Sequence, residues 1–245
     1  GVLVGISITD ILESNEEQID AYARKIRSRV DEVMSRLQMV VPVYVVFTKV
    51  DLIDGFSEFW ADLRKSERSQ MWGMTFPLAA APDRDAAKAF QEEFERLVST
   101  LHARSVRRLA QERNPDARAK IFQFPAEFRA IESSVAEFLN ALFQKNQFSE
   151  TPIFRGVYFT SGTQEGRPLS RIVSGMLRAF NLSPASVGPD TQPQTEAKSY
   201  FLTDVFRRVV FPDQDVAART EGELRRQLIQ RIGFAAAAFL LAMMV

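Results

Sequence analysis

The chain has 245 residues, of which 46% are hydrophobic, so one large or two small domains with a sizeable core are expected. The chain has 31 Lys and Arg residues and 31 Asp and Glu residues, so it has no net charge that would attract nucleic acid. Its sequence also shows no basic stripe of the kind that binds DNA or RNA. The sequence has no cysteine and a single histidine, His102, which argues against disulfides, thiolate metal sites and His-based triads. We expect His102 at a solvated surface position.

The first region has the pattern of a βαβ unit. Residues 1–9 (GVLVGISIT) predict a buried strand, and Ser14 with Glu17 forms a capping-box pattern that starts a helix running through Gln38. The apolar positions of this helix recur at helical spacing, namely Ile19, Tyr22, Ile26, Val30, Val33 and Leu37. A second strand is expected from Pro42 to Thr48. Strand, helix and strand with short connections predict parallel neighbours with a right-handed crossover.

The second strand ends directly in Thr48-Lys49-Val50-Asp51, the Thr-Lys-x-Asp pattern that ends the guanine-reading strand of GTPase-like domains. Ligands of parallel sheets bind at the carboxyl ends of the strands. There Asp51 would accept hydrogen bonds from N1–H and the 2-amino group of guanine, the stem of Lys49 would lie over the base, and Thr48 would tether the turn. The alternative is an ordinary strand followed by a turn in which Asp51 caps the next helix.

A phosphate-binding loop of the form G-x-x-x-x-G-K-[ST] does not occur in the sequence. Either such a loop lies upstream of Gly1 or the nucleotide site is vestigial. We therefore expect no cofactor within this chain, with GTP or ATP and Mg²⁺ entering only if the upstream loop exists. No metal site is predicted, because Asp10 resembles a metal-holding acid but follows the wrong strand for that role.

The middle of the chain is predicted to be helical. Residues 56–72 are typical of one helix, followed by a short extended stretch at residues 74–77. Residues 79–150 are predicted to form a helical subdomain inserted into the α/β domain, with helices over residues 83–113 and 125–143 and a break at Pro115. Each helix has an aromatic and aliphatic stripe on one side and charges on the other.

The sheet is expected to resume at residues 153–159 (IFRGVYF), so that residues 1–78 and 151–182 form the α/β domain. This third strand ends in a small Gly-rich turn, in which Ser161 and Gly162 occupy the place where backbone N–H groups of GTPase-like domains meet the guanine carbonyl. Any Gly-rich turn from a strand to a helix looks similar. A helix headed by Pro168 is expected over residues 169–180.

The last region begins with a linker at residues 183–199, rich in Pro, Ser, Thr and Gln. A C-terminal helical extension follows at residues 200–231, and its apolar positions between Tyr200 and Pro212 could dock back on the domain. Residues 232–245 contain no polar side chain and predict the start of a transmembrane helix or a terminal core helix. Three arginines before this run favour a cytoplasmic location for residues 1–231, namely Arg225, Arg226 and Arg231.

Several longer stretches carry a family resemblance: VPVYVVFTKVDLIDGFSEFW, MWGMTFPL, FRGVYFTSGTQEG and YFLTDVFRRVVFPD, followed by the final apolar run. In this order they resemble the cytoplasmic region of the IcmF family, whose TssM members are inner-membrane components of bacterial type VI secretion systems. The resemblance covers nearly the whole chain. It implies an α/β fold with a partial P-loop GTPase-like parallel sheet, an inserted helical subdomain and membrane helices on both sides.

The resemblance also implies location, partners and site residues. It places this region on the cytoplasmic side of the bacterial inner membrane, in an oligomeric complex. The implied partners are the TssL cytoplasmic domain, TssJ through a periplasmic part beyond Val245, and baseplate or TssA-type proteins. The candidate nucleotide-binding residues are Thr48, Lys49, Asp51, Ser161 and Gly162, which would read the base and perform no catalysis.

Two functions from different classes are consistent with these observations. The first is a platform domain that links the membrane complex to partner and baseplate proteins, which requires only exposed apolar and charged faces. The second is a nucleotide-dependent switch or NTPase that energises assembly or secretion. That function requires a phosphate loop, metal ligands and a group that positions water, none of which is identifiable in the sequence.

Overall fold

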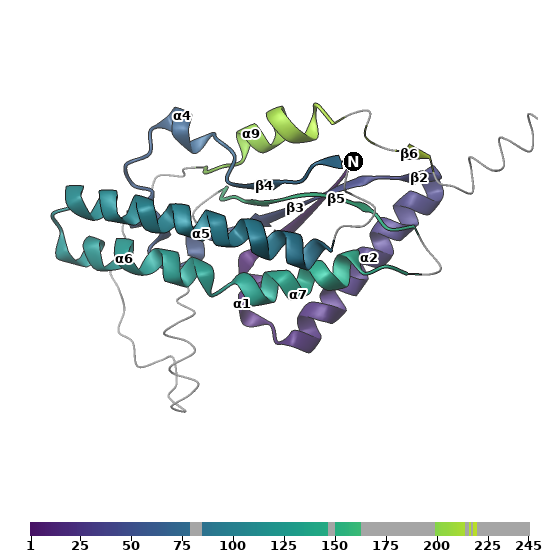
Figure 1. Ribbon diagram of the computed structural model, residues 1–245, viewed down its shortest axis with the longest axis horizontal. Helices are drawn as coiled ribbons and strands as arrows, with labels where there is room; N and C mark the ends of the chain where they lie inside the picture. The colour runs from purple at the N-terminus through teal and green to yellow at the C-terminus, as the bar shows by residue number, and fades with distance from the viewer. Residues whose placement is uncertain (79–84, 147–149, 163–198, 214–215, 217, 220–245) are drawn as a thin grey trace, which may run out of the picture.

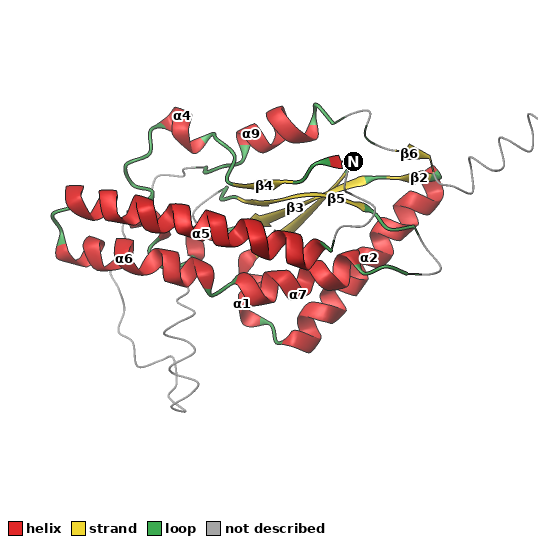
Figure 2. Cartoon of the chain, viewed as in Figure 1, coloured by secondary structure: helices red, strands yellow, loops and turns green. Residues whose placement is uncertain are grey.

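The computed structural model describes residues 1–78, 85–146, 150–162, 199–213, 216, 218 and 219. It has an α/β fold with one four-stranded sheet (Figures 1 and 2). The strands are β1 (Val2–Ser7), β3 (Pro42–Thr48), β5 (Ile153–Phe159) and β4 (Gly73–Thr75), in the order β1-β3-β5-β4. Strands β1, β3 and β5 are parallel, which confirms the predicted βαβ unit and the return of the chain to the sheet.

The sheet is nevertheless mixed, because β4 runs antiparallel to β5. The sequence analysis predicted a parallel sheet, and the fourth strand corrects that prediction. A parallel strand needs a crossover that carries the chain back to the other end of the sheet. Between β3 and β4 the chain forms only a 3₁₀ turn at Val50–Leu52 (η1) and two short helices, so it enters β4 from the end at which β3 finished.

Strand β1 is shorter and more exposed than predicted. It ends at Ser7, and residues Ile8–Glu13 form a short helix, α1. Within the described residues β1 pairs only with β3 and lies at the edge of the sheet. Val4 and Ile6 are buried, whereas Leu3, on the other face, is 39% exposed. The alternation is that of a strand covered on one face only.

Helix α2 (Glu16–Leu37) forms as predicted, with its start shifted by one residue. The capping box joins Asn15 and Gln18, in place of the predicted Ser14 and Glu17: the Asn15 side chain accepts from the Gln18 amide at 2.9 Å, and the Gln18 side chain accepts from the Asn15 amide at 3.0 Å. Val33 and Leu37, predicted on the apolar stripe, are exposed. Ile19 and Val30 are buried as predicted, and at 3.6 residues per turn the rest of the buried face follows Ala23, Arg27 and Met34.

The predicted helix over residues 56–72 is divided into α3 (Phe56–Phe59) and α4 (Lys65–Arg68). The ring centroids of Trp60 and Trp72 lie 5.5 Å apart. In a continuous helix these two residues would be separated by about 18 Å along the axis. The chain bends between them because both rings join one aromatic cluster with Phe56 and Phe124.

The helical layer consists of α5 (Ala86–Gln111), α6 (Pro115–Arg129) and α7 (Glu132–Phe143). The predicted break at Pro115 is confirmed, and Pro115 is the first residue of α6. The predicted helix start at Pro125 is wrong, because Pro125 lies inside α6. A proline there leaves the Ile121 carbonyl without its helical donor, and the Ser105 hydroxyl of α5 approaches that carbonyl at 3.5 Å.

These helices cover one face of the sheet and share its core (Figure 1). Phe138 of α7 and Phe128 of α6 contact the strands, with centroid distances of 6.2 Å to Phe47 and 4.9 Å to Phe159, respectively. The core is therefore continuous from the strands into the helical layer. The division of the chain into an α/β domain and an inserted subdomain remains a prediction.

The opposite face is covered by α9 (Thr203–Val205) and the π-helical turn η4 (Phe206–Val210). Val205 and Val209 pack against Tyr44, Val46 and Tyr158, so the predicted docking of this segment is confirmed. Nearby, β2 (Met39–Val40) pairs antiparallel with β6 (Ala218–Arg219). The helix predicted over residues 169–180, most of the linker, most of the helical extension beyond Asp213 and the apolar run 232–245 lie outside the described residues, and the part of the extension at Ala218–Arg219 is a strand and not a helix. Among the described helices, none is long and apolar enough to cross a membrane.

Candidate functional site

The predicted nucleotide-site residues gather at the carboxyl ends of β3 and β5. These strands are parallel neighbours, so Thr48, Lys49 and Asp51 lie at the same edge of the sheet as Ser161. Two backbone hydrogen bonds join the strand ends directly: the Thr160 amide donates to the Phe47 carbonyl at 2.7 Å, and the Val50 amide donates to the Thr160 carbonyl at 3.2 Å.

Thr48 and Lys49 define the turn that leaves β3. The Thr48 hydroxyl donates to the Ile6 carbonyl of β1 at 3.1 Å, which ties the turn to the neighbouring strand. Lys49 has a left-handed backbone with φ of 58° and an exposed side chain. A left-handed backbone is uncommon for a residue other than glycine. It turns the chain sharply from β3 into η1 and leaves the Lys49 stem on the surface at the edge of the site.

Asp51 is enclosed at this turn. It is 7% exposed, Ser161 is fully buried, and within the described part of the chain neither Asp51 Oδ1 nor Ser161 Oγ makes a well-formed hydrogen bond, although the Ser161 hydroxyl lies close enough to act on the carboxylate. Burial raises the pKa of Asp51 above its usual value, while the nearby Ser161 hydroxyl and the charge of Lys49 act in the opposite direction. Two buried oxygens without a well-formed hydrogen bond are unusual in a folded protein and indicate a place for a polar ligand or an ordered water.

The structure also decides the alternative interpretation of Asp51. The next helix, α3, begins after Gly55, and no side chain caps it. Asp51 lies inside η1, which begins after Lys49 and also lacks a side-chain cap. The interpretation of Asp51 as a helix cap is therefore wrong.

The sequence analysis did not find the partner of Ser161. The Ser161 amide donates to the Tyr200 carbonyl at 3.0 Å, and the Tyr200 amide donates back to the Ser161 carbonyl at 2.8 Å. The amide predicted to face a guanine carbonyl is thus engaged by the chain itself. Gly162 follows Ser161 on the surface, with open space where a Cβ would lie.

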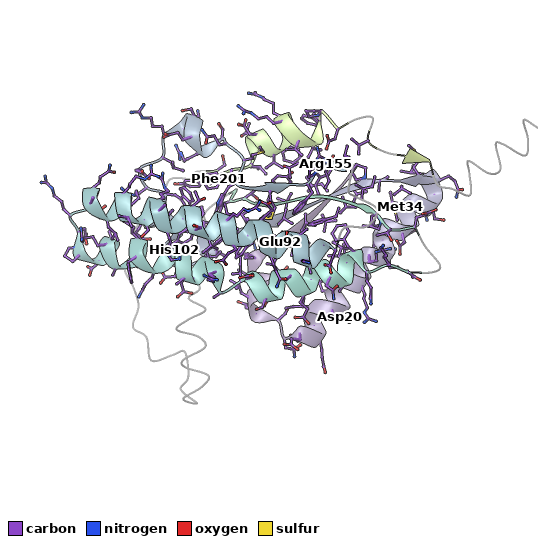
Figure 3. All side chains as sticks on the ribbon, in the orientation of Figure 1. Asp20, Met34, Glu92, His102, Arg155 and Phe201 are labelled. Atoms are coloured by element: carbon purple, nitrogen blue, oxygen red, sulfur yellow. The ribbon has the colours of Figure 1, made fainter. Side chains whose placement is uncertain are left out.

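Phe201 fixes this C-terminal segment beside the site (Figure 3). Its backbone is left-handed, with φ of 61°, and its amide donates to the Arg68 carbonyl at 2.6 Å. Its ring lies 5.1 Å from Trp60 and 5.3 Å from Trp72. In the sequence, the only sign of this arrangement is the apolar composition that begins at Tyr200 after a polar linker.

The remaining candidates do not form a metal or catalytic centre. Within the described residues there is no group of three or more His, Cys, Asp or Glu side chains that could hold a metal ion. Asp10 is exposed on α1. His102 is exposed on α5, as predicted (Figure 3). The geometry at residues 48–51 and 161 can recognise a polar group.

Comparisons with known proteins agree with the sequence motifs. The family model described as the IcmF-related N-terminal domain matches residues 1–238. The type VI secretion system component TssM1 of Pseudomonas aeruginosa is 37% identical over 246 residues, a match that covers 100% of this chain and 22% of that protein. No solved structure matches. The chain thus corresponds to about a fifth of its relative's length, and it belongs to the IcmF family as the N-terminal region of a TssM-type component of a type VI secretion system.

Proposed function

We propose that this region is a platform domain through which a TssM-type protein connects the membrane complex of a type VI secretion system to its partner proteins. Family membership supports a role in the secretion apparatus. The proposed location is the cytoplasmic side of the bacterial inner membrane. The proposed partners are the TssL cytoplasmic domain and baseplate or TssA-type proteins, with TssJ contacted by a part of the protein beyond Val245.

The observation that carries this proposal is an exposed apolar pair on the outer side of the helical layer. Val106 of α5 is 69% exposed and Phe122 of α6 is 70% exposed. The contact between the Ser105 hydroxyl and the Ile121 carbonyl places the two following residues at the same level of the α5–α6 hairpin. Large exposed apolar side chains that lie near one another favour a protein contact over a solvated surface.

One exposed charged side chain lies directly beside this pair and offers selectivity. Arg107 follows Val106 on α5 and is exposed. Glu92 lies further along the exposed side of the same helix (Figure 3). An apolar centre within a charged rim is the usual anatomy of a protein interface.

The test replaces Val106 and Phe122 with Ser in the full-length protein and measures secretion and co-purification of partner proteins. We expect secretion to fall at least tenfold while the melting temperature changes little, because both side chains are exposed. The matched control is Leu37→Ser on α2, which removes another exposed apolar side chain. A charge reversal, Arg107→Glu, tests the charged neighbour of the pair. Normal secretion in both the double variant and the charge reversal would contradict the platform proposal for this face.

A second candidate function is a nucleotide-dependent switch, and the two buried oxygens of Asp51 and Ser161, neither of which makes a well-formed hydrogen bond, favour it. In this proposal residues 1–78 and 151–182 form part of a GTPase-like domain, residues 79–150 form its inserted subdomain, and Thr48, Lys49, Asp51, Ser161 and Gly162 read the base. GTP or ATP with Mg²⁺ would require a phosphate loop upstream of Gly1.

The switch is tested by nucleotide binding to the full-length protein. We expect GDP to bind with micromolar affinity and Asp51→Ala to weaken binding at least 100-fold, since a lost base-reading carboxylate leaves two guanine donors unpaired. Asp54→Ala, three residues further along, is the control and should bind GDP normally. Unchanged binding in Asp51→Ala would remove the base-reader assignment.

A further inference from the structure

A second exposed surface is formed by α4 together with the α9–η4 segment, which lie side by side along one edge of the molecule (Figure 1). Two backbone hydrogen bonds join them: the Phe201 amide donates to the Arg68 carbonyl at 2.6 Å, and the Asp204 amide donates to the Ser69 carbonyl at 3.0 Å. We name it the α4–α9 surface and define it by Arg64, Lys65, Met71, Arg207, Arg208 and Phe211.

The surface is basic. Arg64, Lys65 and Arg207 are exposed and form no ion pair within the described chain, although the Glu67 carboxylate of α4 accepts from the Arg64 amide at 2.8 Å. Arg208 is paired with Asp204 at 3.2 Å, yet its side chain is 67% exposed while that of Asp204 is 9% exposed. The cations therefore face solvent, and the acidic partner is held beneath them.

The same surface exposes apolar side chains among these cations. Phe211 is 61% exposed and Met71 is 45% exposed. The Phe206 ring lies 6.1 Å from the Phe211 ring and is only partly buried. The segment itself is anchored from below, because Val205 and Val209 are buried against the sheet. One side of the α9–η4 segment thus packs on the protein, and the other displays phenylalanine and arginine.

We propose that the α4–α9 surface lies on an anionic phospholipid surface, with Phe211 at the level of the lipid headgroups. Exposed aromatic side chains within a basic face are what such a surface attracts, and each cation near it strengthens the contact. The chain supplies a second argument. Residues 214–231 connect this surface to the apolar run 232–245 and span at most roughly 65 Å when fully extended.

The chain passes from Phe211 to β6 (Ala218–Arg219), which is held on β2, so residues 220–231 tether the apolar run to β6 and span at most roughly 43 Å. If that run enters a bilayer, the tether keeps the α4–α9 surface at a high local concentration near the lipid headgroups. An acidic protein could also satisfy the cations, but it would not explain why an apolar run follows them in the sequence. The proposal does not depend on the platform or switch functions, since it uses other residues.

The absence of cysteine from the sequence allows a direct test. The variant Phe211→Cys is labelled with an environment-sensitive fluorophore, and the full chain is reconstituted into vesicles of phosphatidylglycerol and phosphatidylethanolamine. We expect a blue shift of the emission that is absent in phosphatidylcholine vesicles and decreases at high salt. A label at Phe122→Cys, on the α5–α6 hairpin, is the positional control and should not shift.

A second experiment removes charges to distinguish a contact made by the α4–α9 surface from a general electrostatic attraction of the protein to the vesicle. Lys65→Gln with Arg207→Gln should lower the ratio of docked to undocked surface by about 25-fold, which is about fivefold for each cation. Lys88→Gln with Arg107→Gln removes the same charge from α5 and should leave the shift unchanged. Equal shifts in anionic and neutral vesicles, or equal effects of the two double variants, would overturn the proposal. Protein adducts in place of lipid adducts from a photocrosslinker at position 211 in cells would overturn it as well.

Discussion

Arg155 and Asp213 join the central sheet to the end of the α9–η4 segment through a two-pronged ion pair. Arg155 Nε lies 2.6 Å from Asp213 Oδ2, and Nη2 lies 3.2 Å from Oδ1. The Tyr44 hydroxyl donates to the same Oδ2 at 2.8 Å, and Arg155 also donates to the Phe76 carbonyl. Strands β3 and β5 thus meet at the Asp213 carboxylate, and Arg155, labelled in Figure 3, also joins the chain after β4 to this group.

The first prediction concerns this carboxylate. Asp213→Asn should destabilise the docked C-terminal segment by about 2 to 3 kcal/mol, because Arg155 keeps its charge with most of its surface buried and loses its partner. Hydrogen exchange of residues 199–213 should rise, and the rest of the sheet should stay protected. Tyr44→Phe, which removes one neutral donor, should cost about 1 kcal/mol. Equal and small effects of both changes would contradict a central role for Asp213.

The same group gives a pH dependence with a definite sign. Burial alone would raise the pKa of Asp213, but the hydrogen bonds from Arg155 and Tyr44 and the charge of Arg155 together lower it below its usual value. The stabilisation is therefore complete above about pH 4 and is lost as the pH falls through the lower folded-state pKa. The difference between wild type and Asp213→Asn should shrink below pH 4, as measured by urea unfolding at a series of pH values.

The sequence predicted that the ends of β3 and β5 would meet at one edge of the sheet, because local rules determine this. Thr48 and Asp51 follow a β-rich apolar run, and parallel neighbours bring their carboxyl ends to one edge. The same rules could not predict that the Ser161 amide pairs with Tyr200, because the two residues are 39 positions apart in the sequence. Pairings of this kind depend on tertiary packing and not on local preference.

The helix boundaries also could not be predicted from local sequence alone. The spacing of Phe56, Phe59, Trp60 and Leu63 is helical, but Trp60 and Trp72 gain more by meeting in one aromatic cluster than by continuing a helix. Pro125 is the reverse case, since a residue that normally breaks a helix is tolerated inside α6. In both positions, contacts from distant parts of the chain override the local signal.

A second prediction concerns Gly55, which enters α3 with φ of 82°. A Cβ at this position would lie 2.5 Å from the Lys120 carbonyl oxygen, which is backbone and cannot move aside. Gly55→Ala should therefore lower the free energy of unfolding by about 2 to 3 kcal/mol, through left-handed strain and overpacking. Gly5→Ala is the control, since its nearest neighbour is Leu3 Cδ2 at 4.0 Å. A similar loss in both variants would contradict the close approach of α6.

A third prediction concerns Arg27, which is buried on α2 and binds the end of α7. Its Nη1 donates to the carbonyls of Leu142 at 2.9 Å and Gln144 at 3.0 Å, and its Nη2 donates to the Glu150 carbonyl at 3.2 Å. Lysine lacks the planar fork needed for three acceptors. Arg27→Lys should thus cost about 2 to 3 kcal/mol in chemical denaturation followed by tryptophan fluorescence.

The matched control for Arg27 lies on the same helix. Arg29 pairs with Glu32 at 2.9 Å on the surface, where its side chain is 77% exposed. Exposed pairs of this kind contribute little, so Arg29→Lys should leave the denaturation midpoint nearly unchanged. Equal midpoints for the two variants would show that the end of α7 does not depend on Arg27.

The last prediction links stability to the candidate site. Because burial raises the pKa of Asp51, the folded state disfavours the ionised carboxylate, and this cost is present at neutral pH and disappears as the pH falls below the folded-state pKa. Asp51→Asn removes the charge and adds a donor for the nearby Ser161 hydroxyl. We expect the variant to be more stable than wild type by about 1 kcal/mol at pH 7 and by less at pH 4.

Asp54→Asn, a less buried neighbour, is the control and should not reproduce this gain. A loss of stability in Asp51→Asn at pH 7 would contradict the interpretation, because it would mean that the carboxylate already has a strong partner. A gain would have a functional meaning. It would indicate that the Asp51 carboxylate, which lowers the stability of the fold, is retained because an ionised acceptor is needed for binding a ligand. Asn would then stabilise the fold while it weakens recognition of a group that presents two donors.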